Sequence, residues 1–253
     1  MKKISLFALC FLASAIFLAP GCAKKGSNEL HMITEATFAP YEFRRGNDIV
    51  GIDVEIAKAV AAKLGKTLVV DDAKFDSIIP ALKTGKADLA IAGLTVTEDR
   101  KANVDFSIPY VTDSGIVIIS LKDKPYKSAE EAKGKKIGMQ SGTTADTYCV
   151  DVLKQEPERY DSHASAVAAL KAGKLDLVIA DIDPAKNLVK GEDDIFISSD
   201  FLTKEEFAVA VRKDSKDLLA TVNEVITELK TSGKMDEIVA QYKAEADKLK
   251  EAE

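Results

Sequence analysis

A short segment that follows a buried strand carries groups suited to binding an anion. The apolar residues 89–92 predict the strand, and Gly93 follows them directly. A glycine lets a ligand approach the backbone closely, and Thr95 and Arg100 come within the next seven residues. The guanidinium of Arg100 can bind a carboxylate or a phosphate through two parallel hydrogen bonds. Because open α/β sheets bind ligands at the carboxyl ends of their strands, this segment predicts a ligand site, with a plain turn and a surface arginine as the alternative.

An internal repeat supplies the opposite charge. Residues 81–92 (ALKTGKADLAIA) recur as residues 169–180 (ALKAGKLDLVIA), which predicts two similar lobes that each contain a helix followed by a buried strand. Continuing the alignment by one position sets Asp181 against Gly93. One lobe then presents Arg100 and the other presents a carboxylate. A cation that faces an anion across a cleft fits a zwitterion.

A second anion-binding position follows another predicted strand. Residues 136–139 predict that strand, Gln140 to Thr144 follow it, and residues 145–155 predict a helix. Backbone N–H groups at the start of a helix bind anions, and the helix dipole adds to the attraction. The residues around Thr143 and Thr144 therefore predict an anion site.

The elements that position these groups alternate along the chain. In the first part, strands and helices follow one another in the order expected of a parallel sheet, and Asp53 is the predicted N-cap of the first helix. The predicted strands and helices are residues 30–34, a helix after Asp53, 67–70, a helix from Phe75, 89–92, 115–121, 136–139, 145–155, 206–211, 216–231 and 235–249.

The N-terminus predicts export. Lys2 and Lys3 precede an apolar stretch over residues 4–18, which is short for a membrane span and typical of a secretory signal. The small residues before Cys22 resemble the lipobox of bacterial lipoproteins, although Ala19 stands where that motif usually has leucine. We predict a signal peptide over residues 1–21, lipid attachment at Cys22 and a tether to residue 28. A plain signal peptide with an incidental Cys22 is the alternative.

Composition argues against several classes of protein. The formal net charge is −6 and the chain has no basic patch, which disfavours a nucleic-acid partner. Cys149 is the one cysteine that would remain besides Cys22, so no internal disulfide framework is expected. His31 and His163 stand far apart with no cysteine nearby, so we expect neither a metal site nor a cofactor. No phosphate-binding loop for ATP is present.

Several motifs, taken in their order and spacing, resemble one known family. They are residues 35–43, 51–57, 75–82, 92–100, 104–107, 140–144 and 180–181. The chain is similar to the extracytoplasmic solute-binding proteins of ABC importers, in the polar amino-acid branch (family 3). The resemblance implies an α/β, two-lobed periplasmic-binding-protein fold, with parallel or mixed sheets, flanking helices and two hinge crossover strands. It places lobe 1 at residues 29–113 plus 208–253 and lobe 2 at residues 114–207.

The resemblance also implies a role for each site residue. Arg100 would bind the α-carboxylate of an amino acid, helped by Thr95 and by the helix start at Thr143 and Thr144. Asp181 and the Gly93 carbonyl would take the α-ammonium. Two aromatic residues would hold the ligand side chain between them, and two polar residues would set its specificity; these are Phe38 and Phe75, and Glu35 and Gln140.

The identity of the ligand depends mainly on Glu35. A carboxylate in a closed cleft needs a cation or a donor from the ligand, so we expect arginine, lysine or histidine, and glutamine next. Aspartate and glutamate are disfavoured by like charge. If Glu35 pointed to solvent at the mouth of the cleft, this inference would not hold.

The resemblance implies a monomer that closes on a free amino acid and then docks on the permease of an importer. The protein would face the periplasm or the exterior and touch the membrane through its lipid anchor alone. Two alternatives stay open. One is an enzyme like the periplasmic cyclohexadienyl dehydratases, with Glu35 as general acid, although Asp181 would then lack a partner. The other is a ligand-sensing or adhesive surface lipoprotein.

Overall fold

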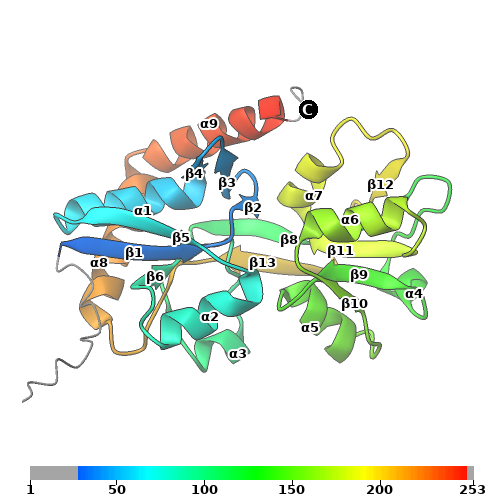
Figure 1. Ribbon diagram of the computed structural model, residues 1–253, viewed down its shortest axis with the longest axis horizontal. Coiled ribbons are helices and arrows are strands. Elements are labelled where there is room, and N and C mark those ends of the chain that lie inside the picture. Colours follow the sequence, from blue (N-terminus) through cyan, green and yellow to red (C-terminus); the bar gives the residue numbers. More distant parts are fainter. Residues whose placement is uncertain (1–27, 250–253) are drawn as a thin grey trace, which may run out of the picture.

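Two β-sheets lie end to end in the computed structural model, which describes residues 28–249 (Figure 1). Both sheets mix parallel and antiparallel pairs. The first has the order β5 (Thr67–Asp72), β1 (Glu29–Thr34), β6 (Leu89–Ala90), β14 (Ala210–Val211), β7 (Asp105–Phe106). The second has the order β10 (Glu158–Tyr160), β9 (Ile137–Gln140), β11 (Leu177–Asp181), β8 (Val111–Leu121), β12 (Ile195–Ile197), with β13 (Thr203–Phe207) also paired to β8. A small sheet of β2 (Thr37–Phe38), β3 (Glu42–Arg45) and β4 (Asp48–Val50) flanks the first.

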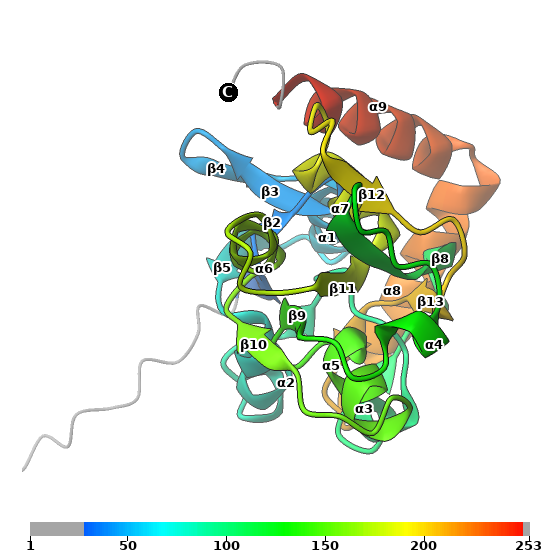
Figure 2. The same ribbon diagram turned by 90° about the vertical axis from the view of Figure 1, so that its right-hand side faces the viewer.

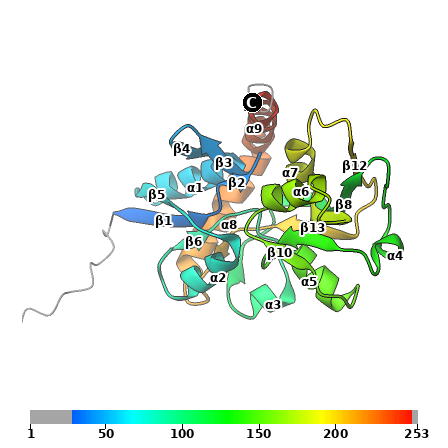
Figure 3. The same ribbon diagram turned by 45° about the vertical axis from the view of Figure 1, so that its right-hand side comes forward.

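Helices cover both faces of each sheet, which confirms the predicted α/β class. Along the first sheet lie α1 (Ile52–Lys63), α8 (Lys216–Thr231) and α9 (Lys234–Leu249) on one face, and α2 (Phe75–Lys83) on the other, next to α3 (Glu98–Lys101) (Figure 3). Along the second lie α6 (His163–Lys171) and α7 (Ile182–Leu188) on one face, and α4 (Ala129–Ala132) and α5 (Thr144–Asp151) on the other (Figure 2).

Burial on both faces explains the continuous apolar runs of the strands. In β11, Leu177 and Ile179 pack into the core beneath α5, and Val178 and Ala180 pack into the core beneath α6. Successive side chains of a strand point to opposite faces, so a strand covered on both sides is apolar at every position.

The repeated segment forms the same structure twice. In the first copy the N–H of Gly85 bonds the carbonyl of Leu82, and in the second the N–H of Gly173 bonds the carbonyl of Leu170. Both glycines have a left-handed backbone, with φ of 74° and 70°, which ends the helix and turns the chain toward the strand. The repeat therefore places Gly93 shortly after β6 and Asp181 at the last residue of β11.

The predicted strand over residues 206–211 is divided in the structure. β13 pairs with β8 in the second sheet, whereas β14 pairs with β6 and β7 in the first. The chain passes from one sheet to the other at Ala208 and Val209. The predicted strand is therefore two strands, because its two ends pair with different sheets. β8 spans the same gap beside β13 (Figure 1).

The predicted N-cap role of Asp53 is wrong. Helix α1 begins at Ile52 with Gly51 as its N-cap, and Asp53 lies fully buried in the first turn. A Cβ at Gly51 would stand 2.0 Å from the Tyr41 carbonyl oxygen, so only glycine allows this approach. The carboxylate of Asp53 instead accepts the N–H of Gly93 at 2.9 Å, which fixes the backbone at the end of β6.

The predicted signal peptide and Cys22 lie outside the described residues. Between residues 28 and 249, none of the helices combines the length and the apolar character needed to cross a membrane.

Candidate ligand-binding site

A small, largely closed cavity lies where the two sheets meet. Nine of the ten predicted binding residues line it, and Glu35 lies one hydrogen bond away on Gln140. The first sheet and its neighbours contribute Phe38, Phe75, Gly93, Thr95 and Arg100, and the second contributes Gln140, Thr143, Thr144, His163 and Asp181.

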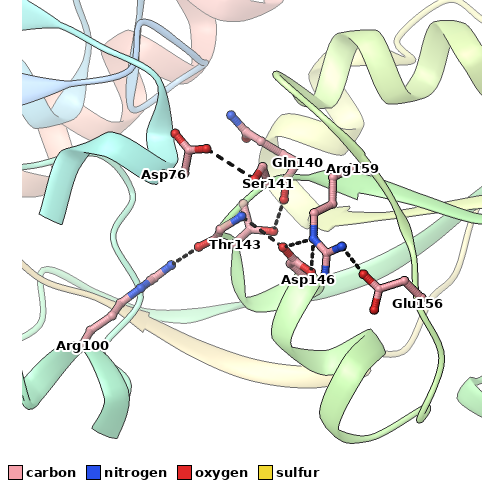
Figure 4. Close-up of polar contacts among 9 residues, drawn as sticks. Asp76, Arg100, Gln140, Ser141, Thr143, Asp146, Glu156 and Arg159 are labelled. Atoms are coloured by element: carbon pink, nitrogen blue, oxygen red, sulfur yellow. Dashed lines mark hydrogen bonds and ion pairs between the residues drawn. The ribbon is translucent and has the colours of Figure 1, made fainter. Parts of the chain in front are cut away.

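Arg100 bridges the two sides of the cavity. Its Nη1 donates to the Thr95 carbonyl at 2.8 Å, and its Nη2 donates to the Gly142 carbonyl at 3.2 Å. The guanidinium lies over the ring of Phe75, 5.3 Å from the ring centre, where a cation is attracted to the aromatic face. Figure 4 shows Arg100 reaching from α3 toward the turn before α5. Burial lowers the pKa of Arg100, but an arginine stays protonated at neutral pH.

The turn after β9 is held by its own side chains. The hydroxyl of Thr143 donates to the Gln140 carbonyl at 2.8 Å, and the N–H of Gly142 donates to Asp146 at 3.2 Å (Figure 4). Arg159 pairs with Asp146 at 2.8 Å and anchors the turn from β10. The first N–H groups of α5 have no partner within the helix, so they can meet an anion in the cavity.

Glu35 is buried, which removes the alternative that it points to solvent. The residue is 7% exposed, and Nε2 of Gln140 stands 2.7 Å from each oxygen of the Glu35 carboxylate. Burial raises the pKa of Glu35, and the bond from Gln140 offsets this in part. A buried carboxylate whose donors, Gln140 and Thr37, carry no charge favours a cation or a further donor beside it.

Gly93 allows an aromatic ring to reach the backbone. Its φ is 52°, and a Cβ at this position would stand 2.3 Å from Cε1 of Phe38. The close approach predicted at Gly93 is therefore made by the Phe38 ring. This contact sets the ring in the cavity wall beneath the end of β6.

Sequence reasoning missed His163, which lines the cavity beside Asp181. The residue is 3% exposed, its ring lies 5.8 Å from that of Phe38, and its Nε2 stands 3.6 Å from the Asp181 carboxylate. Neither ring nitrogen has a hydrogen bond within the described part of the chain. Burial lowers the pKa of His163 to about 4, so the ring is neutral at pH 7. The available signal was a polar residue on the buried face of an otherwise apolar helix.

Sequence reasoning also missed Glu205. This residue of β13 is 3% exposed and accepts the Thr95 hydroxyl at 3.0 Å. The alternation of the TKEEF strand contained a signal, because Glu205 lies two residues before the buried Phe207 and so on the same face.

Side chains from the two halves also meet around the cavity. The hydroxyl of Tyr41 donates to Asp183 at 2.8 Å, and the amide of Asn187 donates to the Ala39 carbonyl at 2.8 Å. An exposed ion pair joins Lys74 to Asp161 at 2.8 Å. The two halves are thus drawn together over the cavity.

The arrangement suits a small zwitterion better than a metal ion or a nucleophilic reaction. Arg100 and Asp181 supply opposite charges from the two halves, and Glu35 supplies a further negative charge. Residues 28–249 contain no group of three or more His, Cys, Asp or Glu side chains placed to hold a metal ion. Cys149 is a buried free thiol, and burial raises its pKa to about 12, which leaves it un-ionised.

The chain is similar to proteins of one known family. The model of the family described as bacterial extracellular solute-binding proteins, family 3, matches residues 30–245. The chain is 34% identical to ABC transporter arginine-binding protein 1 of Escherichia coli K12, over 96% of this chain and 99% of that protein.

Among solved structures, an ancestral arginine-binding protein bound to arginine superposes with a TM-score of 0.79 at 37% identity, covering 85% of this chain and 98% of that one. An ancestral arginine-binding protein bound to glutamine gives a TM-score of 0.79 at 38% identity, covering 85% and 97%. These neighbours confirm the predicted two-lobed fold.

Proposed function

The chain belongs to the bacterial extracellular solute-binding proteins, family 3, and we propose that it binds a basic amino acid between its two halves for an ABC importer. Arginine is the first candidate ligand, lysine and histidine follow as the other basic amino acids, and glutamine comes after them. One observation carries this proposal: Arg100 and Asp181 line the same cavity from different halves, while the buried Glu35 lies behind Gln140 of its wall.

The α-carboxylate is assigned to Arg100 and to backbone N–H groups. Thr95 pairs with Phe207 in an antiparallel bridge. The backbone hydrogen bonds of this bridge are made by the residues on either side: the Val96 N–H donates to the Glu206 carbonyl, and the Ala208 N–H donates to the Leu94 carbonyl. The N–H of Thr95 therefore points away from β13 and toward the cavity. The Thr95 hydroxyl already donates to Glu205, so the N–H is the group that we assign to the ligand, together with the start of α5 at Thr143 and Thr144.

The α-ammonium is assigned to Asp181 and the Gly93 carbonyl, and the ligand side chain to the aromatic pair and Glu35. Phe38 and Phe75 offer ring faces to an aliphatic stem or a cation. A guanidinium beside Glu35 would give this buried carboxylate a positively charged partner, whereas the amide of glutamine would supply hydrogen-bond donors without charge. Relatives named for arginine support the first choice, and the neighbour bound to glutamine supports the second.

Binding would favour closure, because the two charged partners of the zwitterion, Arg100 and Asp181, belong to different halves. We assign lobe 1 to residues 29–113 plus 208–253 and lobe 2 to residues 114–207. The contact between Tyr41 and Asp183 would then form only on closure. The closed monomer would dock on a membrane permease, held near the membrane by a lipid on Cys22, on the periplasmic or exterior side.

We propose a binding protein and no enzyme. The relatives reported above are solute-binding proteins. A substrate without an ammonium group would leave the buried Asp181 without its partner, which disfavours a dehydratase of this fold.

The test is a thermal-shift panel of the twenty amino acids, ornithine, citrulline and prephenate, on protein that has been unfolded and refolded to remove any bound ligand. A ligand at a hundredfold excess over its Kd stabilises the folded state by about 2.7 kcal/mol. A shift with arginine, lysine, histidine or ornithine supports the proposal. A shift with prephenate and with no amino acid would overturn it.

A further inference from the structure

Two buried carboxyl groups lie near each other behind the proposed ammonium site. Asp181 ends β11 and Glu205 lies on β13, and both strands flank β8. Asp181 pairs with Ile116 of β8 and Glu205 with Ser114, two residues away and thus on the same face. The residues are 5% and 3% exposed, and the two carboxyl groups lie close enough to interact strongly.

The surroundings of the pair supply too little positive charge for two carboxylates. Arg100 of α3 is the cation that faces them, His163 of α6 is neutral, and Asp183 of α7 adds negative charge. The hydroxyl of Thr95 donates to Oε2 of Glu205, and the Thr144 hydroxyl lies beside the same carboxyl. Oε1 of Glu205 lacks a hydrogen bond of ordinary geometry to any N–H or O–H of the described residues.

Two carboxyl oxygens can be hydrogen-bonded only if a proton lies between them, since two ionised groups in a buried site repel strongly. Burial and the neighbouring Asp181 raise the pKa of Glu205 well above its ordinary value, which agrees with a protonated Glu205. A proton on Glu205 could bond one oxygen of Asp181 and would leave the other oxygen to the cavity that Asp181 lines.

We propose that Glu205 is a positioning residue, held as a neutral carboxylic acid that donates to Asp181 and orients its carboxylate toward the ligand ammonium. The inference rests on the proposed function, because it assigns the ammonium to Asp181. With Glu205 neutral, the single negative charge of Asp181 balances the positive charge of Arg100. The site proposed for the α-carboxylate and α-ammonium then carries no net charge, which matches a zwitterion. An ionised Glu205 would make the site negative and favour amines that lack a carboxylate.

The first test needs no ligand. Infrared spectra near neutral pH report the C=O stretch of un-ionised carboxyl groups, and Glu205→Gln removes one such group. Glu42→Gln is the matched control, because Glu42 is also fully buried beside Asp53 and its pKa is raised well above the ordinary value by burial. We expect Glu205→Gln to remove the part of the band that belongs to Glu205. Glu42→Gln is expected to keep that part. A band that is unchanged in Glu205→Gln would overturn the proposal.

The second test is affinity for arginine by calorimetry. Glutamine in place of Glu205 can still donate an N–H to Asp181 and accept from Thr95, whereas alanine can do neither. We expect Glu205→Ala to weaken binding by about tenfold or more and Glu205→Gln to restore affinity to within about threefold of the unaltered protein. Equal losses in the two variants would overturn the neutral-donor role. If the unaltered protein bound no amino acid, the proposed function would fail while the infrared result would still stand.

Discussion

Replacing Glu35 by glutamine separates a charged ligand from a neutral one. Glu35 is 7% exposed, so solvent screens its charge weakly, and Gln140 holds both oxygens at 2.7 Å. The variant keeps the shape of the side chain and one acceptor for Gln140, and it removes the negative charge. A hydrogen bond to a charged group contributes about 1.5–3 kcal/mol, so we expect arginine affinity to fall by about 10- to 150-fold.

Glutamine is the ligand that makes this test sharp. Its neutral amide can bond the new amide almost as well as the carboxylate, so its affinity is expected to change by less than about threefold. Asp76→Asn is the matched control variant, because Asp76 is an exposed carboxylate at the rim, 3.4 Å from Ser141, and exposed charges contribute little. Calorimetric titration with both ligands measures the ratio. If arginine lost no more affinity than glutamine, the pairing of Glu35 with the ligand cation would be refuted.

Three further predictions concern other residues of the site. Arg100→Lys keeps the charge but loses the planar fork and the contact with Phe75, so calorimetry is expected to show arginine affinity reduced by at least about tenfold; an unchanged affinity would contradict the clamp. Gly93→Ala forces a Cβ to 2.3 Å from the Phe38 ring at a φ of 52°, so thermal unfolding is expected at a clearly lower Tm, and an unchanged Tm would disprove the tight contact. His163 has a pKa of about 4 in the folded state and of 6.5 when unfolded, so the unfolded state binds more protons between these two pH values. The free energy of unfolding therefore falls as the pH drops from 6.5 to about 4, by up to about 1.4 kcal/mol per pH unit. His163→Gln should flatten this part of the curve, and an identical pH profile in both proteins would contradict the burial of a neutral ring.

The sequence predicted most of the cavity because its residues stand at ends of repeated elements. Gly93 and Asp181 close two copies of one helix–strand unit, so their equivalence in space followed from their equivalence in the repeat. Arg100 came from the same turn, and its position on α3 is fixed by the Thr97 hydroxyl, which accepts the Arg100 N–H at 3.2 Å. Local spacing was sufficient for these residues.

The residues that sequence reasoning missed or misread depend on long-range packing. Glu205 gains its role from the register of two strands on either side of β8, which no local pattern specifies. His163 faces the cavity because α6 packs on the second sheet, and its place on the buried face of the helix does not by itself show which residues that packing brings beside it. Asp53 has the residue type of an N-cap, but its burial against Gly93 and Tyr110 gives it a different set of donors. In each case the partner is distant in sequence.

The most direct measurement is a calorimetric titration of the refolded protein with L-arginine, repeated with arginine amide, in which the α-carboxylate is blocked. If Arg100 and Asp181 hold the two charges of a zwitterion, L-arginine binds one to one, and the amide binds at least about tenfold more weakly because Arg100 loses its partner. Binding of both ligands with equal affinity, or no heat from L-arginine, lysine, histidine or glutamine, would contradict recognition of an amino acid in this cavity.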